Sequence, residues 1–166
     1  MSFTSFHDET HRQRLSSALK AVRRLRGLKA AQVAEAMGMP LRSYEHFEGG
    51  AGRFDFAKVR QFAEATNADA FAIQASVQIG SPAFAARTAG NKLMTLLLLT
   101  LEEFDAELGD EIAGLDSATL LGEFADASRR LIVEARRRRA MAESRSGLKA
   151  DGGSEPGPPN KKDPAA

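Results

Sequence analysis

The sequence contains no cysteine and no tryptophan, and it has a single tyrosine. Without cysteine, disulfide bonds, thiolate metal sites and cysteine nucleophiles are excluded, and the composition fits a reducing compartment. The longest largely apolar run, residues 93–101, is far shorter than the ~20 residues that a membrane span needs. No segment combines the basic, apolar and small-residue parts of a secretory signal. We therefore expect a cytoplasmic protein with no membrane partner.

Charge is nearly balanced overall but unevenly distributed along the chain. The formal net charge is +1, and 43% of the residues are apolar, enough for a core. Residues 1–78 carry 11 Lys/Arg against 8 Asp/Glu, a net of +3, whereas residues 79–142 carry 8 against 10, a net of −2. The remaining residues are balanced at 4 against 4. A basic front half suits a nucleic-acid partner.

Hydrophobic periodicity predicts an all-α fold. Apolar residues recur at helical spacing over residues 13–26, 30–37, 40–47, 56–63 and 69–77, and no alternating strand pattern competes. Gly27 and Gly38 are natural helix ends, and Asp55 is a natural N-cap. We therefore predict a five-helix domain over residues 10–80.

The second part of the chain is predicted as a helical hairpin over residues 83–143. Its first helix, residues 83–108, is apolar on nearly every side, so a single neighbouring helix face cannot cover it. The second helix begins behind a cap at Asp116 or Ser117 and ends near Glu143. Residues 144–166 are rich in Gly, Pro, Ser and charge, which predicts a disordered tail.

Residues 28–50 carry the most informative pattern, a short helix, a glycine turn and a second short helix. Gly38 can adopt the positive φ that a sharp turn needs, and the small Ala34 lets the two helices approach closely. Tyr44 and Phe47 are apolar and should seat the second helix on the first. This arrangement places a helix in the DNA major groove. The outward residues, which we predict to contact bases, are Leu41, Arg42, Ser43, Glu45 and His46.

Arg42 is the strongest candidate among these residues. A guanidinium can bind guanine O6 and N7 together, which is worth roughly 1–3 kcal/mol of discrimination. Ser43 and His46 can each reach a base or a phosphate, and Leu41 can contact a thymine methyl group.

Residues 15–73 resemble the lambda-repressor-like helix-turn-helix family, also called Cro-like or xenobiotic-response-element type. The resemblance lies in four blocks with the family's order and spacing, residues 22–28 (VRRLRGL), 33–39 (VAEAMGM), 44–50 (YEHFEGG) and 59–65 (VRQFAEA). It implies that Glu48 pairs with a basic residue of the first helix, such as Arg24 or Arg26. It also implies phosphate contacts near the start of the second helix and in the loop after the third, to which we add basic groups of the first helix. These predicted contacts are Lys29, Arg53, Arg23 and Arg26.

The sequence departs from the family pattern at two places. Lys29 and Ala30 stand where the family usually has a hydroxyl and then a glutamine, so an amide that orients a phosphate is missing. Pro40 stands where Ser or Thr commonly caps the recognition helix, and proline tolerates such a position.

The leucine-rich segments permit two readings, a hairpin packed within one chain or an interface between two chains. We favour a homodimer, because one recognition helix reads too few base pairs and paired half-sites ~34 Å apart are the usual remedy. The Arg136–Arg139 run is either a solvated helix end or a second DNA contact. The predicted dimerisation residues are Leu93, Leu97, Leu98, Leu101, Phe104, Leu120, Phe124 and Leu131.

The sequence thus predicts a dimeric, sequence-specific repressor that occupies a palindromic operator on double-stranded DNA. Two alternatives remain: a protein-interaction module, such as an antitoxin or adaptor that holds a protein partner through its C-terminal helices, and a transcription activator. No nucleophile–base pair or phosphate-binding loop is evident, so we expect neither an enzyme nor a cofactor. His7 and His11 have the i, i+4 spacing of a zinc site but lack a third ligand, so no metal is expected.

Overall fold

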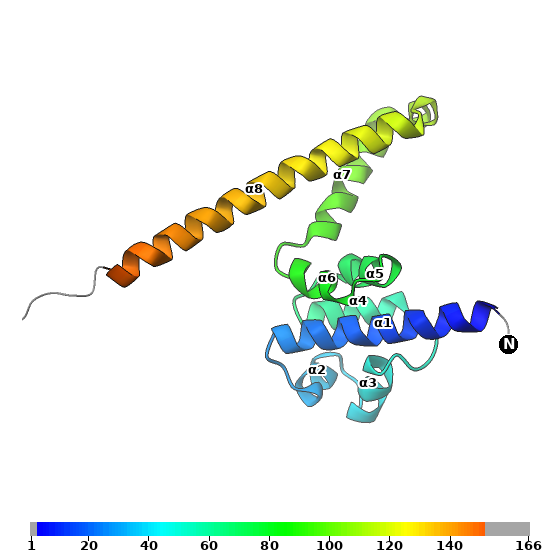
Figure 1. Ribbon diagram of the computed structural model, residues 1–166. Helices are drawn as coiled ribbons and strands as arrows, with labels where there is room; N and C mark the ends of the chain where they lie inside the picture. Colours follow the sequence, from blue (N-terminus) through cyan, green and yellow to red (C-terminus); the bar gives the residue numbers. More distant parts are fainter. Residues whose placement is uncertain (1–2, 152–166) are drawn as a thin grey trace, which may run out of the picture. The chain divides into compact units, whose positions relative to one another are not determined.

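The computed structural model describes the backbone of residues 3–151 and the side chains of residues 10–145. Within that range the chain forms eight α-helices and one 3-10 helix, and it contains no strand (Figure 1). The predicted all-α fold class is therefore confirmed. The elements in chain order are α1 (Phe3–Leu25), α2 (Ala30–Ala36), α3 (Leu41–Glu48), α4 (Phe56–Ala65), α5 (Ala70–Gln78), α6 (Pro82–Thr88), α7 (Leu93–Leu108), η1 (Gly109–Gly114) and α8 (Ser117–Asp151).

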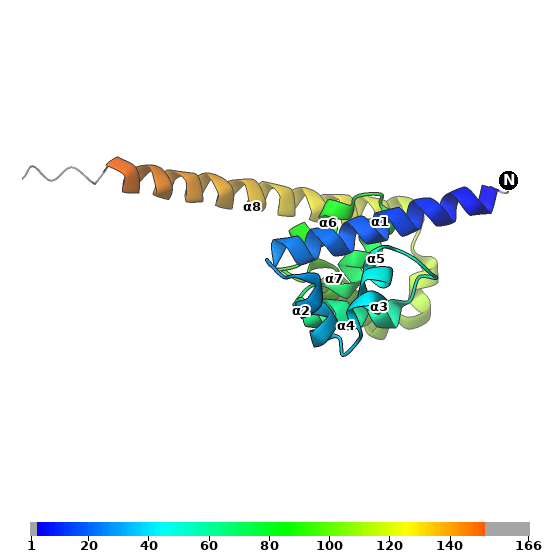
Figure 2. The same cartoon turned by 90° about the horizontal axis from the view of Figure 1, so that it is seen from below.

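Helix α1 organises the first part of the molecule. It packs against α3, α5 and α6, and α2 packs against α3 and α4. In the view of Figure 2, α2, α3 and α4 lie below α1. The apolar stripe of α1 faces this core, with Leu19 and Val22 fully buried against side chains such as Val33, Phe62 and Ile73. Burial of such side chains is the main stabilising contribution in a domain of this size.

The predicted five-helix domain corresponds to α1–α5. Helix α1 begins at Phe3, earlier than the start predicted near residue 13, while the later helix starts agree with the pattern. Asp55 caps α4 as predicted, since its Oδ1 accepts from the amides of Ala57 at 3.0 Å and Lys58 at 3.2 Å. The positions of the glycine stops and polar caps therefore determine these helix boundaries.

The predicted helix over residues 83–108 is wrong in one respect, because the structure divides it. Helix α6 ends at Thr88 and α7 begins at Leu93, and Lys92 between them has a φ of 54°. Helix α6 belongs to the core of the first five helices, since Ala85 and Ala89 are fully buried there. The alanines of this segment fit a continuous helix equally well, and Gly90 is only a weak signal for the break.

Asp69 joins the start of α7 to the start of α5. Its Oδ1 accepts from the amides of Phe71 at 3.1 Å and Ala72 at 3.2 Å, which caps α5. The same carboxylate accepts from the amides of Met94 at 2.9 Å and Thr95 at 3.1 Å, and from the Thr95 hydroxyl at 2.9 Å. One side chain, 1% exposed, therefore caps two helices that lie far apart in the sequence.

The chain divides into two compact units, residues 1–108 and residues 109–166. The second unit contains η1 and α8, and Asp116 begins α8 by accepting from the amides of Ala118 and Thr119, both at 2.9 Å. Helix α8 continues to Asp151, past the end predicted near Glu143. The rest of the predicted tail, residues 152–166, lies outside the described residues. No helix among the described residues is long and apolar enough to cross a membrane.

Candidate nucleic-acid interface

A glycine turn joins α2 to α3. Gly38 has a φ of 64°, in the left-handed region that the sequence predicted for this position. Its amide donates to the Glu35 carbonyl at 2.9 Å, and the next amide, of Met39, donates to the Ala34 carbonyl at 3.0 Å. These bonds satisfy the last carbonyls of α2 and reverse the chain within a few residues. Pro40, at a φ of −59°, then precedes the first turn of α3.

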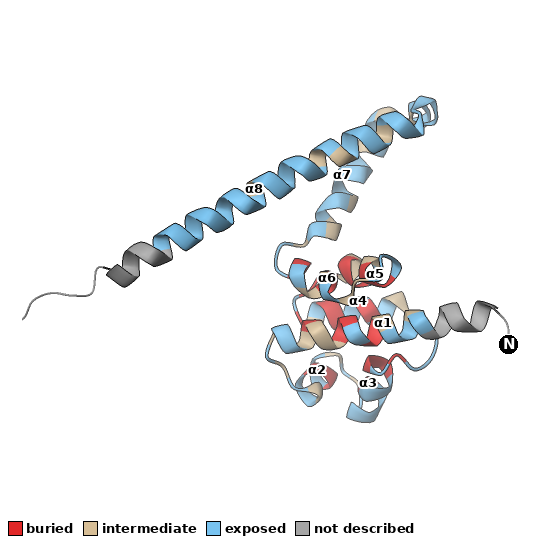
Figure 3. Ribbon diagram, viewed as in Figure 1, coloured by how far each residue is buried: buried red, intermediate tan, exposed pale blue. Residues whose placement is uncertain are grey.

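The two faces of α3 differ sharply in exposure. Tyr44 is fully buried and Phe47 is 9% exposed, so both side chains seat α3 on the core as predicted. The Phe47 ring lies 6.3 Å from that of Phe62 on α4, centre to centre. Figure 3 shows buried residues in red and exposed residues in pale blue. The five predicted base-contact residues all lie on the exposed side: Leu41, Arg42, Ser43, Glu45 and His46.

A buried ionic network fixes the end of α3 to α1. Glu48 is 5% exposed, and its two oxygens accept from Arg23, Oε1 from Nε at 2.6 Å and Oε2 from Nη2 at 3.1 Å. The Tyr44 hydroxyl donates to the same Oε1 at 2.8 Å. The prediction that Glu48 pairs with the first helix is confirmed, but the partner is Arg23 rather than Arg24 or Arg26. The side chain of Arg23 lies on the inner side of α1, which explains the choice.

Two side chains of this network have shifted proton affinities. The bidentate bond to Glu48 raises the pKa of Arg23 above its usual range. Burial, followed by the bond to Glu48, raises the pKa of the Tyr44 hydroxyl well above its ordinary value. The network thus holds a charged Arg23 and a neutral Tyr44 around one carboxylate, and a fork of two parallel bonds fixes geometry as well as charge.

The four predicted phosphate contacts fall into two groups. Lys29, at the N-terminus of α2, and Arg53, in the loop between α3 and α4, are both exposed. Arg23 is engaged with Glu48 and with the Leu28 carbonyl at 3.2 Å. Arg26 donates to the carbonyls of Thr66 at 2.9 Å, Asn67 at 2.5 Å and Ala89 at 3.3 Å. The guanidinium groups of Arg23 and Arg26 therefore serve contacts within the fold.

The sequence model of a family described as a helix-turn-helix domain matches residues 14–72, which extend from α1 to the first turn of α5. Residues 14–72 are a helix-turn-helix domain. The match is consistent with the lambda-repressor-like resemblance and supports DNA binding by this part of the chain, since such domains dock a recognition helix in the major groove. No curated protein and no solved structure matches the chain at a significant level.

A glutamine caps the N-terminus of α2, although Ala30 replaces the glutamine of the family pattern. The Gln32 side chain, one turn beyond the Lys29–Ala30 departure, accepts at Oε1 from the Lys29 amide at 2.8 Å. The polar spacing of Lys29 and Gln32 is the signal that indicates this cap. An exposed cation and an amide thus stand together at the start of α2.

The residues predicted for dimerisation lie outside the helix-turn-helix domain, on α7 and α8. No described residue of either helix is buried. On α7, Leu93 is 36% exposed, Leu97 41% and Leu101 38%, while Leu98 and Phe104 are half-buried. On α8, Phe124 and Leu131 are exposed and Leu120 is half-buried.

The arginine run of α8 is largely paired with acids of its own helix. Arg137 and Arg138 each donate through Nε to Glu134, at 2.8 Å and 2.7 Å, and Arg139 donates to Glu143 at 2.8 Å. These bonds lower the pKa of Glu134, with Arg137 the first cause. Exposed pairs of this kind contribute little to stability. Among the described side chains, no group of three or more His, Asp or Glu residues lies close enough to hold a metal ion.

Proposed function

We propose that the protein is a sequence-specific DNA-binding transcription regulator that acts as a homodimer and represses by occupying a palindromic operator. The observation that carries the proposal is the outward face of α3, where five side chains stand exposed on a helix that Tyr44, Phe47 and Glu48 hold firmly from behind. A rigid scaffold beneath an exposed helix is what base readout requires, because misplacement of the helix would cost direct contacts.

Within this proposal Arg42, Ser43 and His46 contact bases, together with Leu41 and Glu45 on the same exposed side of α3. Lys29 and Arg53 contact phosphates on either side of the recognition helix. We leave Arg23 and Arg26 out of the phosphate contacts, because a phosphate would have to compete with the bonds these two arginines make inside the domain.

Arg42→Ala tests the DNA contact. We expect the variant to lose roughly 1–3 kcal/mol of affinity for its target and to lose discrimination at one base pair. Arg87→Ala is the matched control, since Arg87 is also exposed but lies on α6. The measurement is a binding titration over a range of salt concentrations, on target sites mapped across the genome. Absence of binding to any DNA at low salt would overturn the proposal and favour the interaction-module alternative.

The dimer rests on an apolar stripe of α7. Leu93, Leu97, Leu101, Phe104 and Leu108 follow one another at intervals of three or four residues, which places them on one side of the helix. By the same geometry this side is turned away from Thr95, through which α7 is bonded to Asp69. Leu98 lies outside the stripe, so we leave it out of the interface, and a cleft with Phe71 of α5 is lined by Leu98 and by Leu101 at the edge of the stripe. A second copy would cover the stripe, and an uncovered stripe favours aggregation.

Leu97→Glu tests the dimer. A carboxylate in an apolar interface lacks a partner, so we expect the variant to sediment as a monomer and to lose cooperative binding to a palindromic site. Ile79→Glu is the control, because Ile79 is a 60% exposed apolar residue at the end of α5, away from α7's stripe. A wild-type protein that is monomeric when it occupies its DNA sites would refute the dimer while leaving DNA binding in place.

A further inference from the structure

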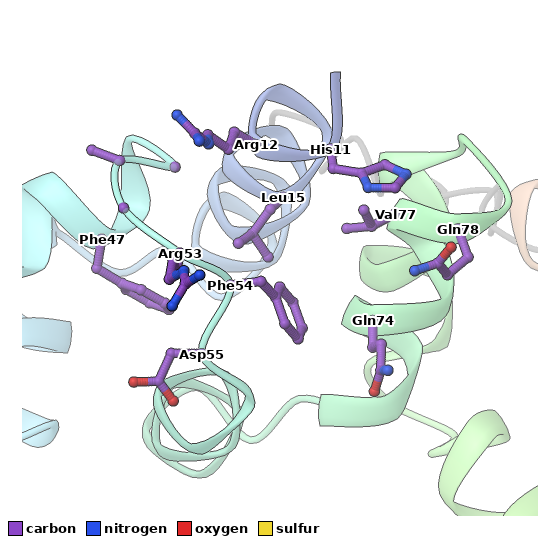
Figure 4. A pocket seen from close by; sticks show the side chains of 13 residues that line it. His11, Arg12, Leu15, Phe47, Arg53, Phe54, Asp55, Gln74, Val77 and Gln78 are labelled. Atoms are coloured by element: carbon purple, nitrogen blue, oxygen red, sulfur yellow. The ribbon is translucent and has the colours of Figure 1, made fainter. Parts of the chain in front are cut away.

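A cavity of about 620 Å³ lies beside the end of the recognition helix. Its walls come from the N-terminal part of α1, the loop between α3 and α4, and the C-terminal half of α5 (Figure 4). The volume falls within the range of small-molecule sites, which are concave and combine apolar walls with a few converging polar groups. None of the residues assigned to base contacts lines it.

The apolar part of the cavity ends in an exposed aromatic ring. Leu15, Phe47 and Val77 are buried residues that line the wall. Phe54 lies in the loop between α3 and α4 and remains 47% exposed, and Figure 4 shows its ring in the space between Leu15 and Gln74. A phenylalanine held at the edge of a cavity offers a face on which a flat apolar group can stack.

The polar part of the cavity contains an exposed cation and amide groups. Arg53 lines it together with one carboxylate, Asp55. Oδ1 of Asp55 is already occupied by the two amides that begin α4. Gln74 and Gln78, one turn apart on α5, add exposed amide groups. An exposed guanidinium and amide donors beside a single engaged acid favour an anionic group.

The loop that closes the cavity is held against α1 at Gly50. This residue has a φ of 74°, and a Cβ there would lie 2.4 Å from the Arg12 carbonyl oxygen. The loop backbone therefore packs directly against the backbone of α1, and the contact leaves no room for a side chain at position 50. The wall is fixed before any ligand arrives, which lowers the entropic cost of binding.

We propose that this cavity binds a small organic anion with a flat apolar part, of the aromatic carboxylate class, and that its binding weakens the binding of DNA. The ring stacks on Phe54, and the carboxylate accepts hydrogen bonds from Arg53 and the glutamine amides. The regulatory half rests on the proposed function, in which Arg53 contacts a DNA phosphate. A ligand that engages Arg53 competes for that contact, and coupling between the two sites is reciprocal.

The first test measures ligand binding by the full-length chain without DNA. Calorimetric titrations use 2-naphthoate, its neutral counterpart 2-naphthamide, and inorganic phosphate. We expect 2-naphthoate to bind at least about tenfold more tightly than either of the others, because only it satisfies both parts of the cavity. Absence of 2-naphthoate binding overturns the proposal. Equal binding of inorganic phosphate would also overturn it and would mark the cavity as a DNA phosphate contact.

Two substitutions locate the ligand within the cavity. Phe54→Ala and Arg53→Gln should each weaken 2-naphthoate binding at least about tenfold, while Arg87→Gln on α6 leaves it unchanged. Phe54 and Arg53 are exposed, so their variants should fold, and thermal unfolding verifies this. Should Phe54→Ala fail to fold, Phe54→Leu, which keeps apolar volume but removes the ring face, replaces it. Undiminished 2-naphthoate binding by folded variants at both positions would place the ligand elsewhere and refute the proposal.

The second test adds DNA. Saturating 2-naphthoate should raise the dissociation constant for a mapped operator about tenfold, and DNA should weaken 2-naphthoate binding by the same factor. Unchanged DNA affinity would refute the regulatory half. The two proposals fail separately: a chain that binds 2-naphthoate but no DNA loses its proposed function and keeps its ligand site, and the reverse outcome loses the ligand site alone.

Discussion

Tyr44 reports on the whole domain because it is the single tyrosine of the chain and is fully buried. Its hydroxyl donates to Glu48, which in turn binds Arg23. The absorbance of tyrosinate therefore follows one known side chain. The signal comes from the residue that seats the recognition helix on the core.

Stability should fall at alkaline pH through Tyr44. Burial raises the pKa of its hydroxyl in the folded domain above the ordinary value of 10.0. Above about pH 10 the unfolded chain releases this proton while the folded chain retains it, so the free energy of unfolding decreases as pH rises. Urea titrations at about pH 9 and about pH 11 measure the decrease. Tyr44→Phe should reduce the slope and cost about 1 kcal/mol at neutral pH. Tyrosinate absorbance that rises before the helical signal is lost would contradict the expectation.

Gly50 tests whether the loop after the recognition helix is held by direct backbone contact. Gly50→Ala places a Cβ 2.4 Å from the Arg12 carbonyl oxygen, at a φ of 74°. We expect the free energy of unfolding to fall by more than about 2 kcal/mol, from the clash together with the left-handed conformation. Gly52→Ala separates these effects, because Gly52 has a φ of 92° but open space around its missing Cβ. That variant should lose about 1 kcal/mol. Equal losses of stability for both variants would mean that the contact between Gly50 and α1 does not contribute to the free energy of unfolding.

The side-chain directions within α3 could be predicted from the sequence. Tyr44 and Phe47 lie three residues apart in a short, largely polar helix, so their burial on one face follows from helical spacing. The partner of Glu48 could not be predicted, because Arg23, Arg24 and Arg26 lie within one turn of α1. The spacing of apolar residues does not predict side-chain direction to within one residue, so it does not show which arginine faces the core.

At the scale of elements, Asp69 has the largest role of any single polar side chain. Its carboxylate accepts five hydrogen bonds, from two amides of α5 and from two amides and one hydroxyl of α7. Nearby, the Lys92 ammonium donates to the Ala68 carbonyl at 2.7 Å, and burial lowers the pKa of Lys92. Both contacts tie the start of α7 to the start of α5.

Loss of Asp69 should therefore cost more than loss of an ordinary cap. Asp69→Ala removes the caps of two helices and leaves buried amides without acceptors, so we expect a destabilisation of about 3 kcal/mol. Asp55→Ala removes the two bonds of a single cap on α4 and should cost about 1 kcal/mol. Chemical denaturation of both variants gives the comparison. Similar losses of stability in the two variants would show that the bonds between Asp69 and α7 do not contribute to the free energy of unfolding.

The elements after α5 were predicted less well, for a physical reason. The break between α6 and α7 depends on bonds from Lys92 and Asp69 to residues more than twenty positions away, and Gly90 alone is too weak a stop to reveal it. The cavity beside α3 was likewise beyond prediction, because its walls come from three separate parts of the chain. Local patterns determine helix ends, whereas such contacts exist only once the chain has folded.

At the scale of the molecule, the core lies entirely in the first unit. Every described residue that is buried lies between Leu15 and Ala89. A chain that ends after Leu108 should therefore retain the folded helix-turn-helix domain, with a free energy of unfolding within about 1 kcal/mol of the full-length value. Amide resonances of α1–α5 should remain close to their full-length positions. Widespread collapse of these resonances would show that the domain depends on η1 or α8.

The bonds between Asp69 and α7 make α7 a fixed arm rather than a hinged one. Any change in the direction of α7 must break the three bonds that Met94 and Thr95 make to Asp69, the side chain that also caps α5, so the arm is held directly to the domain that carries the recognition helix. In a dimer assembled through the stripe of α7, the separation of the two recognition helices would be built into each copy before they meet. A new operator spacing would then require a longer or shorter arm, in steps of 1.5 Å and about 100° per inserted residue, rather than a more flexible joint.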